Sequence, residues 1–231
     1  MRREITGFSN PLLREIRGLR EKKLRKRAGL FLAEGLRIMT EAREAGFLPE
    51  MLFRVKDRPL HDLEVTLEVE VLANDGDVIE TSADIMAKLS GKDNAQVVVG
   101  VYRDHGTALA DVDRSTAPIW LVAQSMRDPG NLGTMLRTGD AVGAGGLILI
   151  DDCTDPFSVE SVRASMGAIF TQKIVQCRWE EFTAWLRSGT GQLVGTSLQT
   201  DTDYQAARYS APCFILTGNE AQGLPDDYES Q

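Results

Sequence analysis

The stretch from Ile119 to Asp151 constrains the fold of this chain more than any other part of the sequence. A short apolar run, 119–123, leads through a Pro-Gly turn into a segment with helical spacing, and a second apolar run, 147–151, follows. Nearly continuous apolar strands joined by helices are typical of a parallel sheet covered on both faces. The same alternation continues beyond this stretch. It predicts further strands at 172–176, 192–197 and 212–217, and helices at 158–168 and 179–188.

The helix expected at 131–142 carries two polar residues that a functional site could use, Asn131 and Arg137. Asn131 is predicted to begin the helix and to cap its free backbone N–H groups. Arg137 lies further along, where the apolar stripe consists of Leu132, Met135, Leu136 and Val142. Three glycines, Gly143, Gly145 and Gly146, are expected to end the helix. Taken alone, this stretch fits a capped helix with a solvated arginine as well as it fits a site.

The first hundred residues also alternate between predicted helices and strands, so the chain reads as two α/β regions. An amphipathic helix is predicted at 11–27, a strand passing into a helix at 31–44, a strand at 51–55, a half-exposed strand at 63–72, a helix at 77–89 and a buried strand at 96–102. Small, polar and charged residues then mark a linker. We therefore predict an N-terminal domain at 1–106, a linker at 107–117 and a second domain at 118–231.

Charge is distributed unevenly along the chain, although the formal net charge is −8. Residues 1–27 carry +7, from ten Lys and Arg against three Glu, whereas the remaining residues carry −15. A basic segment on an acidic protein is a common footprint for binding a phosphate backbone. A solvated helix face would show the same composition, so the charge indicates a nucleic-acid partner without requiring one.

Composition and motifs exclude several classes of protein. No apolar run approaches the roughly 20 residues that span a bilayer, and the basic start lacks the apolar region of a secretory signal. Cys153, Cys177 and Cys213 form no CxxC pair, so we expect a reducing, cytoplasmic location. With only His61 and His105, neither a His-based triad nor a metal site is expected. There is also no P-loop and no G-x-G-x-x-G after the first strand of either half.

A second glycine-punctuated polar segment, TGNEAQGLP at 217–225, follows the apolar strand near the C-terminus. Glycines at the end of a strand let a loop approach a ligand closely. Asn219 and Glu220 can recognise a polar group there, because sites in such sheets lie at the carboxyl ends of the strands. A tight surface turn would account for each of these residues separately.

Together, DPGNLGTMLRTGDAVGA (128–144), DPFSVESVRASMGAIF (155–170) and FILTGNEAQGLP (214–225) resemble the SpoU (TrmH-type) family of RNA ribose methyltransferases, within the SPOUT superfamily. LVGTSLQT (193–200) is similar to another cofactor loop of that family, and residues 29–45 resemble the entry to its small α/β substrate-binding domain. The resemblance implies a parallel-sheet α/β-knot methyltransferase domain after that small domain. It also implies S-adenosylmethionine-dependent 2′-O-methylation of structured RNA, rRNA rather than tRNA, by a homodimer.

The resemblance also implies roles for individual residues. The catalytic residues would be Asn131, Arg137 and Glu220, and the cofactor-binding residues Thr196, Ser197, Leu216, Gly218, Asn219 and Glu220. Arg163 and Ser165 would lie near the RNA. The basic N-terminal segment adds candidate RNA contacts at Arg14, Arg17, Lys22, Lys23, Arg25, Lys26 and Arg27. No metal ligand is expected.

Members of this family continue past the second motif into a third, with a Ser-Leu-Asn core, which closes a trefoil knot and helps to build the adenosine pocket and the dimer. The present sequence ends at Gln231, so we expect a fragment that lacks the knot-closing segment. An alternative is a non-catalytic RNA-binding or ribosome-assembly protein that keeps the fold. Methylation of a base fits less well, because the spacing from Asn131 to Thr138 is that of the ribose branch.

Overall fold

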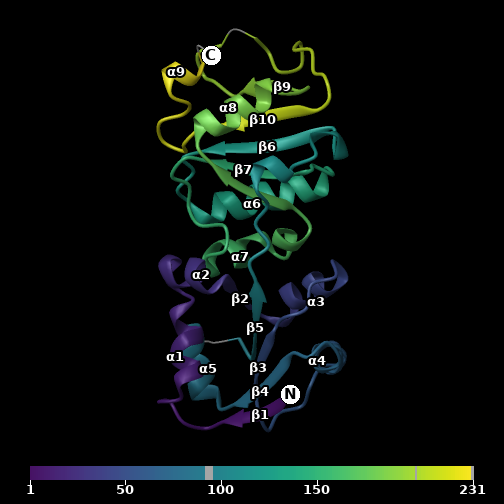
Figure 1. The fold of residues 1–231 in the computed structure, drawn as a ribbon, viewed down its shortest axis with the longest axis vertical. Helices are drawn as coiled ribbons and strands as arrows, with labels where there is room; N and C mark the ends of the chain where they lie inside the picture. Colours follow the sequence, from purple (N-terminus) through teal and green to yellow (C-terminus); the bar gives the residue numbers. More distant parts are fainter. Residues whose placement is uncertain (92–95, 201, 230–231) are drawn as a thin grey trace. The chain divides into compact units, whose positions relative to one another are not determined.

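The computed structural model describes residues 1–91, 96–200 and 202–229, and the chain forms two compact units (Figure 1). Unit 1 comprises Met1–Asp104 and Phe157–Thr171, and unit 2 comprises His105–Pro156 and Gln172–Gln231. The sequence placed 157–171 in the second domain, whereas these residues pack with the first hundred. Short 3₁₀ turns at Leu109–Asp111 and Arg114–Thr116 occupy the predicted linker.

Unit 1 is built on a mixed sheet with the strand order β1-β4-β3-β5-β2. Its elements are β1 (Arg2–Ile5), α1 (Pro11–Gly18), α2 (Lys22–Ala28), β2 (Leu30–Glu34), α3 (Leu36–Glu44), β3 (Met51–Val55), α4 (Asp62–Ala73), β4 (Asp77–Thr81), α5 (Ala83–Ser90), β5 (Val98–Arg103) and α7 (Val159–Ser165). β1, β4 and β3 pair in parallel, and β5 is antiparallel to β3 and β2. Figure 1 shows α1 and α5 on one side of this sheet and α3 and α4 on the other.

The helix predicted at 11–27 is two helices, α1 and α2. The break follows from the side chain of Arg25, which is buried and donates to the carbonyl oxygens of Leu19 (2.8 Å) and Arg20 (2.7 Å) at the end of α1. These carbonyls are the acceptors that a helix terminus leaves without partners. A cation in the basic run thus closes the preceding helix, and the chain turns instead of continuing.

The half-exposed strand predicted at 63–72 was wrong, because these residues form helix α4. His61 Nδ1 accepts from the Leu63 N–H (3.2 Å), and the Glu64 carboxylate accepts from the His61 N–H (3.1 Å), which closes a capping box. Val65 and Val69 are exposed, so the alternating pattern did not mark a buried face. The helix predicted at 77–89 was wrong in its first half, which forms β4, and β1 was not anticipated.

Unit 2 is built on a parallel sheet, as predicted, and its strand order is β8-β7-β6-β10-β9 (Figure 1). Its elements are β6 (Ile119–Gln124), α6 (Pro129–Ala141), β7 (Gly146–Ile150), β8 (Lys173–Cys177), α8 (Trp179–Arg187), β9 (Gln192–Gly195), β10 (Cys213–Thr217) and α9 (Asp226–Glu229). β10 lies between β6 and β9, so the loops that follow β6 and β10 leave the same edge of the sheet side by side.

The two faces of this sheet follow the alternation of side chains along its strands. Trp120, Ile148 and Phe214 pack with Phe182 of α8 in one buried cluster. The opposite face meets α6, where a Cβ on Gly139 would lie 3.0 Å from a methyl carbon of Leu121. A glycine there lets the helix lie close to the sheet. Across the described residues, no helix combines the length and apolarity needed to cross a membrane.

Candidate active site at the carboxyl edge of the parallel sheet

The site is formed where the loops after β6 and β10 meet. The Asn219 side-chain amide donates to the Ser125 carbonyl (2.8 Å), and its oxygen accepts from the N–H groups of Ala221 (2.9 Å) and Gln222 (3.1 Å). Gly218 is required here, because a Cβ would overlap the backbone of Gly223. The GNE segment therefore forms a compact loop tied to the end of β6.

The Glu220 carboxylate joins this loop to the start of α6. It accepts from the backbone N–H groups of Arg127 (3.1 and 3.2 Å) and Asp128 (3.0 Å), and from the Asn131 side-chain amide (3.3 Å). Partial burial raises the pKa of Glu220, but the hydrogen bonds from these N–H donors outweigh it and hold the pKa below its ordinary value. The carboxylate is therefore charged at neutral pH, and hydrogen bonds hold it between the loop after β10 and the start of α6.

The predicted capping role of Asn131 was wrong. Asp128 caps α6, and its carboxylate accepts from the Asn131 N–H (2.8 Å). Pro129 follows as the first helical residue, where its fixed φ suits the helix and no N–H is lost. This places Asn131 inside the first turn and frees its side chain to reach Glu220. The Asp-Pro pair in the sequence was the signal that could have located the cap.

Arg137 lies two turns further along α6 and is exposed. One of its N–H groups donates to the Thr134 hydroxyl (3.2 Å), and that hydroxyl donates to the Gly130 carbonyl (2.9 Å). Six residues correspond to about 9 Å along the helix axis. Among the described residues Arg137 makes no ion pair, so its guanidinium fork is available to a ligand. The structure brings Asn131, Asn219 and Glu220 into contact, whereas Arg137 lies further along α6 without a direct bond to them.

The predicted cofactor residues lie in β10 or directly after β9 and β10, which are adjacent strands. The Thr196 N–H (2.9 Å) and hydroxyl (3.2 Å) both donate to the Leu216 carbonyl, whereas the Leu216 side chain is buried in the core. Thr196 and Ser197 line an open pocket with Tyr204 and Tyr209. Hydroxyls and backbone groups beside apolar and aromatic walls suit a nucleoside-containing cofactor. For the residues the structure describes, no cluster of three or more His, Cys, Asp and Glu is placed to hold a metal ion.

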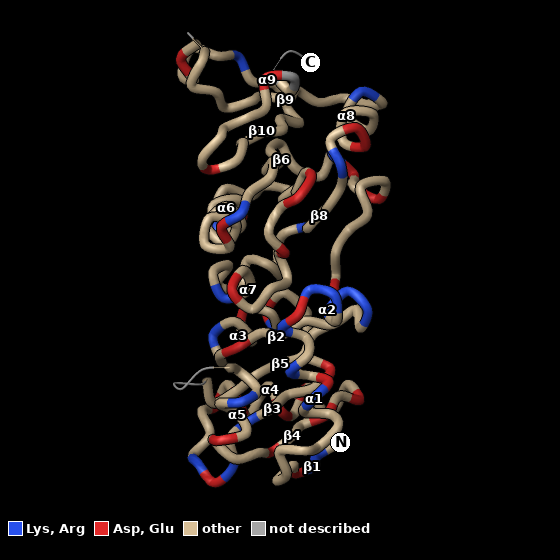
Figure 2. Tube along the Cα trace, turned by 90° about the vertical axis from the view of Figure 1, so that its left-hand side faces the viewer, with Lys and Arg blue, Asp and Glu red and all other residues tan. Residues whose placement is uncertain are grey.

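The predicted RNA-binding residues divide into two groups. Ser165 is buried and donates to the Val162 carbonyl (2.7 Å), and Arg163 pairs with the buried Glu34 of β2. With Arg25, these side chains make contacts within unit 1. The remaining six are exposed on α1 and α2, and Figure 2 shows basic residues along α2. They are Arg14, Arg17, Lys22, Lys23, Lys26 and Arg27.

Two residues of the site were not anticipated from the sequence. The Arg127 backbone N–H is held by Glu220, and its side chain pairs with Asp152 (2.6 Å). Asp151, at the end of β7, accepts from the Trp179 N–H (3.1 Å) and from the Tyr228 hydroxyl (2.7 Å). Asp151 directly follows the buried strand β7, and its left-handed backbone (φ 62°) begins the turn there.

Comparison with known proteins shows the family of the chain. The model of the SpoU rRNA Methylase family matches residues 118–231, and that of the MRM3-like substrate binding domain matches residues 10–100. An AdoMet-bound rRNA methyltransferase from Sinorhizobium meliloti is 34% identical, with a TM-score of 0.90, over 100% of this chain and 86% of that one. The chain belongs to the SpoU rRNA methylase family. The resemblance seen in the sequence motifs is thereby confirmed.

Two further methyltransferases are similar to this chain along most of their length. The Bacillus subtilis 23S rRNA (guanosine(2553)-2'-O)-methyltransferase RlmP is 28% identical, over 96% of this chain and 84% of that protein. The SpoU methyltransferase AviRb from Streptomyces viridochromogenes, in complex with AdoMet, has a TM-score of 0.82 and 28% identity, over 96% of this chain and 85% of that one. In this SpoU-family chain, the joined loops are therefore the candidate active site.

Proposed function

We propose that this protein is an S-adenosylmethionine-dependent methyltransferase that modifies a ribose 2′-hydroxyl in ribosomal RNA. The observation that carries the proposal is the Glu220 carboxylate, which ties the loop after β10 to the start of α6 and leaves Arg137 uncommitted nearby. The named relatives support rRNA over tRNA, since RlmP and the S. viridochromogenes enzyme both modify 23S rRNA. They modify different nucleotides, guanosine 2553 and uridine 2479.

S-adenosylmethionine would be held by the loops after β9 and β10. The hydroxyls of Thr196 and Ser197 and the backbone from Leu216 to Asn219 offer donors and acceptors, and Gly218 keeps that backbone compact. When bound, the cofactor supplies a methyl group on a sulfonium, and the sulfur keeps the electron pair of the broken bond. Glu220 would favour that cationic group by charge. The residues of the chain therefore have mainly to align the hydroxyl, whose proton is released to solvent water as the oxygen takes the methyl group.

Arg137 is assigned to the ribose side of the reaction. A guanidinium stays protonated in proteins, so Arg137 donates hydrogen bonds and does not act as a base. Its fork would clamp the phosphate beside the target ribose and stabilise negative charge that develops on the 2′-oxygen. Asn131 and Glu220 would position the start of α6 and hence the arginine, since they tie it to the cofactor loop.

The same proposal includes the arrangement of the whole protein. Residues 1–106 would bind the RNA substrate, with exposed cations of α1 and α2 on its phosphates, and residues 118–231 would carry out methylation. A trefoil knot, a homodimer and a cytoplasmic location belong to this proposal as well. The family resemblance supports the first two, and the three unpaired cysteines support a reducing compartment.

Methyl transfer from labelled S-adenosylmethionine tests the proposal. The purified protein is incubated with unmodified ribosomal RNA and, separately, with transfer RNA, and the modified nucleotide is mapped. Transfer to a ribose of ribosomal RNA is expected. Isothermal titration with S-adenosylmethionine separates the alternative, since RNA binding with neither cofactor binding nor transfer would identify a non-catalytic RNA-binding protein.

A further inference from the structure

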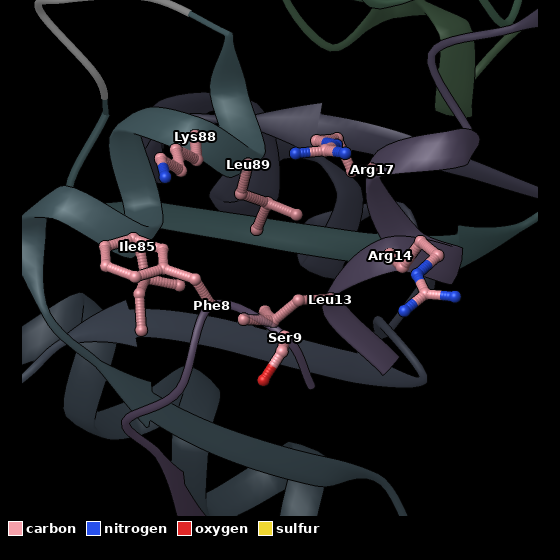
Figure 3. A pocket seen from close by; sticks show the side chains of 8 residues that line it. All are labelled: Phe8, Ser9, Leu13, Arg14, Arg17, Ile85, Lys88 and Leu89. Atoms are coloured by element: carbon pink, nitrogen blue, oxygen red, sulfur yellow. The ribbon is translucent and has the colours of Figure 1, made fainter. Parts of the chain in front are cut away.

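Unit 1 contains an open pocket whose lining combines an aromatic ring, an apolar floor and three cations (Figure 3). Phe8 comes from the loop before α1, and Lys88 comes from α5. Figure 3 shows them on one side of the pocket, with the two arginines of α1, Arg14 and Arg17, on the other. Leu13 lies between them. The pocket therefore draws on segments separated by about 75 residues of chain.

Phe8 is a large apolar residue that is 52% exposed. The ammonium of Lys88 lies 3.9 Å from its centroid, and the floor beneath consists of the buried side chains of Leu13 and Leu89. An exposed aromatic contact of this kind can be an ordinary surface feature. Lys88 is itself exposed, so its ammonium covers the ring from the solvent side.

The arginines favour a ligand. Arg14 and Arg17 stand three residues apart on α1, which places them on the same side of the helix. Both are exposed, and within the described residues neither makes an ion pair. Arg20, in contrast, pairs with the buried Glu34. Arg14 also lines a second pocket, with Leu24 and Arg27, so exposed positive charge continues from the aromatic pocket towards α2.

We propose that this pocket binds an unpaired nucleotide of the RNA substrate, with the base on the Phe8 ring and the adjoining phosphates on Arg14, Arg17 and Lys88. The inference rests on the proposed function because it takes the ligand to be RNA. Unpaired bases are commonly recognised by stacking on aromatic side chains, with cations along the backbone. Stacking of a base is stronger than one exposed cation–π contact, so Lys88 exchanges the ring for a phosphate.

Fluorescence anisotropy with the full chain tests the role of the base. The probes are a single-stranded RNA of about ten nucleotides, an abasic oligonucleotide of the same length and charge, and adenosine monophosphate as a competitor. Phe8→Ala is expected to weaken binding of the RNA about tenfold and to leave binding of the abasic probe unchanged. Phe8→Tyr, which keeps an aromatic ring, is expected to bind the RNA as the wild type does. Val69→Ala, at an exposed apolar position of α4, is the matched control.

The salt dependence of binding tests the cations. Arg14→Gln or Arg17→Gln is expected to lower the slope of log affinity against log salt concentration by about 0.7, whereas Phe8→Ala leaves the slope unchanged. Arg37→Gln removes an equally exposed charge of α3 outside the pocket. An equal change of slope in Arg37→Gln would assign the effect to net charge and overturn the pocket.

The remaining outcomes separate this inference from the proposed function. Equal weakening of both oligonucleotides by Phe8→Ala, or no weakening of either, overturns the pocket. Displacement of the RNA by adenosine monophosphate at comparable concentration assigns the pocket to free nucleotides and overturns it too. Methyl transfer with RNA binding that does not depend on Phe8 refutes only the pocket. Binding that depends on Phe8 without any methyl transfer supports the pocket and refutes the proposed function.

Discussion

Two glutamates show how the units of this protein use charge differently. In unit 1, Glu68 is buried, and its carboxylate lies 2.6 Å from Arg2 and 2.6 Å from Arg54, which also pairs with Glu80 (2.5 Å). In unit 2, Glu220 is exposed, and its partners are backbone N–H groups and the amides of asparagines. The negative charge of Glu68 is balanced by guanidinium groups. The negative charge of Glu220 has no cationic partner among the described residues.

The arginines of the molecule differ in the same way. Arg114 donates to the carbonyls of Trp185 (2.7 Å), Leu186 (3.0 Å) and Thr190 (3.1 Å), and its guanidinium lies 3.8 Å from the Trp185 ring centroid. Arg137 donates only to a hydroxyl of its own helix among the described residues. Charges that are paired inside a unit stabilise its fold, and charges left at the edge of the parallel sheet remain available for a reaction.

The largest expected effect concerns the buried cluster. Glu68→Ala removes one partner of two arginines and leaves the charge of Arg54 poorly compensated, which should lower the free energy of unfolding by about 3–5 kcal/mol. Urea unfolding followed by circular dichroism measures it. Glu70→Gln, which breaks the more accessible pair with Arg43, is the control and should change stability less. Equal effects of the two variants would remove the distinction between buried and exposed charge.

Arg137 carries the next largest effect, and it should appear in the reaction rather than in stability. Arg137→Ala is expected to reduce single-turnover methyl transfer about 10²–10³-fold, with unchanged unfolding and unchanged affinity for S-adenosylmethionine. Arg114→Ala should lower the free energy of unfolding and leave the rate of methyl transfer by the folded protein unchanged, because it removes hydrogen bonds to three carbonyls at the end of α8. A wild-type transfer rate in Arg137→Ala would contradict the catalytic assignment.

The sequence predicts unit 2 more completely than unit 1 for a physical reason. Strands β6, β7 and β10 are nearly continuous apolar runs followed by polar segments, so their type and their functional edge follow from local signals. Helix α4 could not be predicted in the same way. Its buried residues include Glu64 and Glu68, which are buried only because arginines of other segments reach them. Their partners become visible only in the folded chain.

The residues of the site show the same limit. The positions of Asn131 and Glu220 follow from motifs, but their contact depends on β10 lying next to β6, an order that spacing along the chain does not specify. The basic composition of the N-terminal segment also placed Arg25 among the RNA contacts, and the family resemblance placed Arg163 there. In the structure Arg25 closes a helix and Arg163 pairs with Glu34. Composition counts cations but does not show which of them are already paired.

A smaller effect is expected when Glu220 loses its charge but keeps its shape. Glu220→Gln should reduce methyl transfer on the order of tenfold, since hydrogen bonds to an ionised acceptor are about twice as strong as neutral ones. Asn131→Asp is the complementary variant, because it places a second carboxylate beside Glu220 and should repel it. Titration with S-adenosylmethionine separates loss of binding from loss of rate. Activity unchanged in both variants would show that the contact is only structural.

The smallest effect is the dependence of stability on pH, and it compares Glu220 with the buried Glu64. Burial raises the pKa of each carboxyl, and the hydrogen bonds that each accepts outweigh it, so both pKa values lie below the ordinary 4.5. A carboxyl with a lower pKa in the folded chain stabilises it fully above the unfolded pKa, and this contribution disappears as the pH falls through the folded pKa.

The difference in unfolding free energy between wild type and Glu220→Gln should therefore stay constant from pH 8 to about 5 and shrink below about 4.5. All three tryptophans lie in unit 2, so their fluorescence follows the unit that contains Glu220. Glu64→Gln, followed by circular dichroism, should show the same direction with a larger difference at neutral pH, because its carboxylate is paired with Arg58 in a buried position. A difference for Glu220→Gln that changes between pH 8 and 6 would point to another titrating group and remove Glu220 as the charged centre of the site.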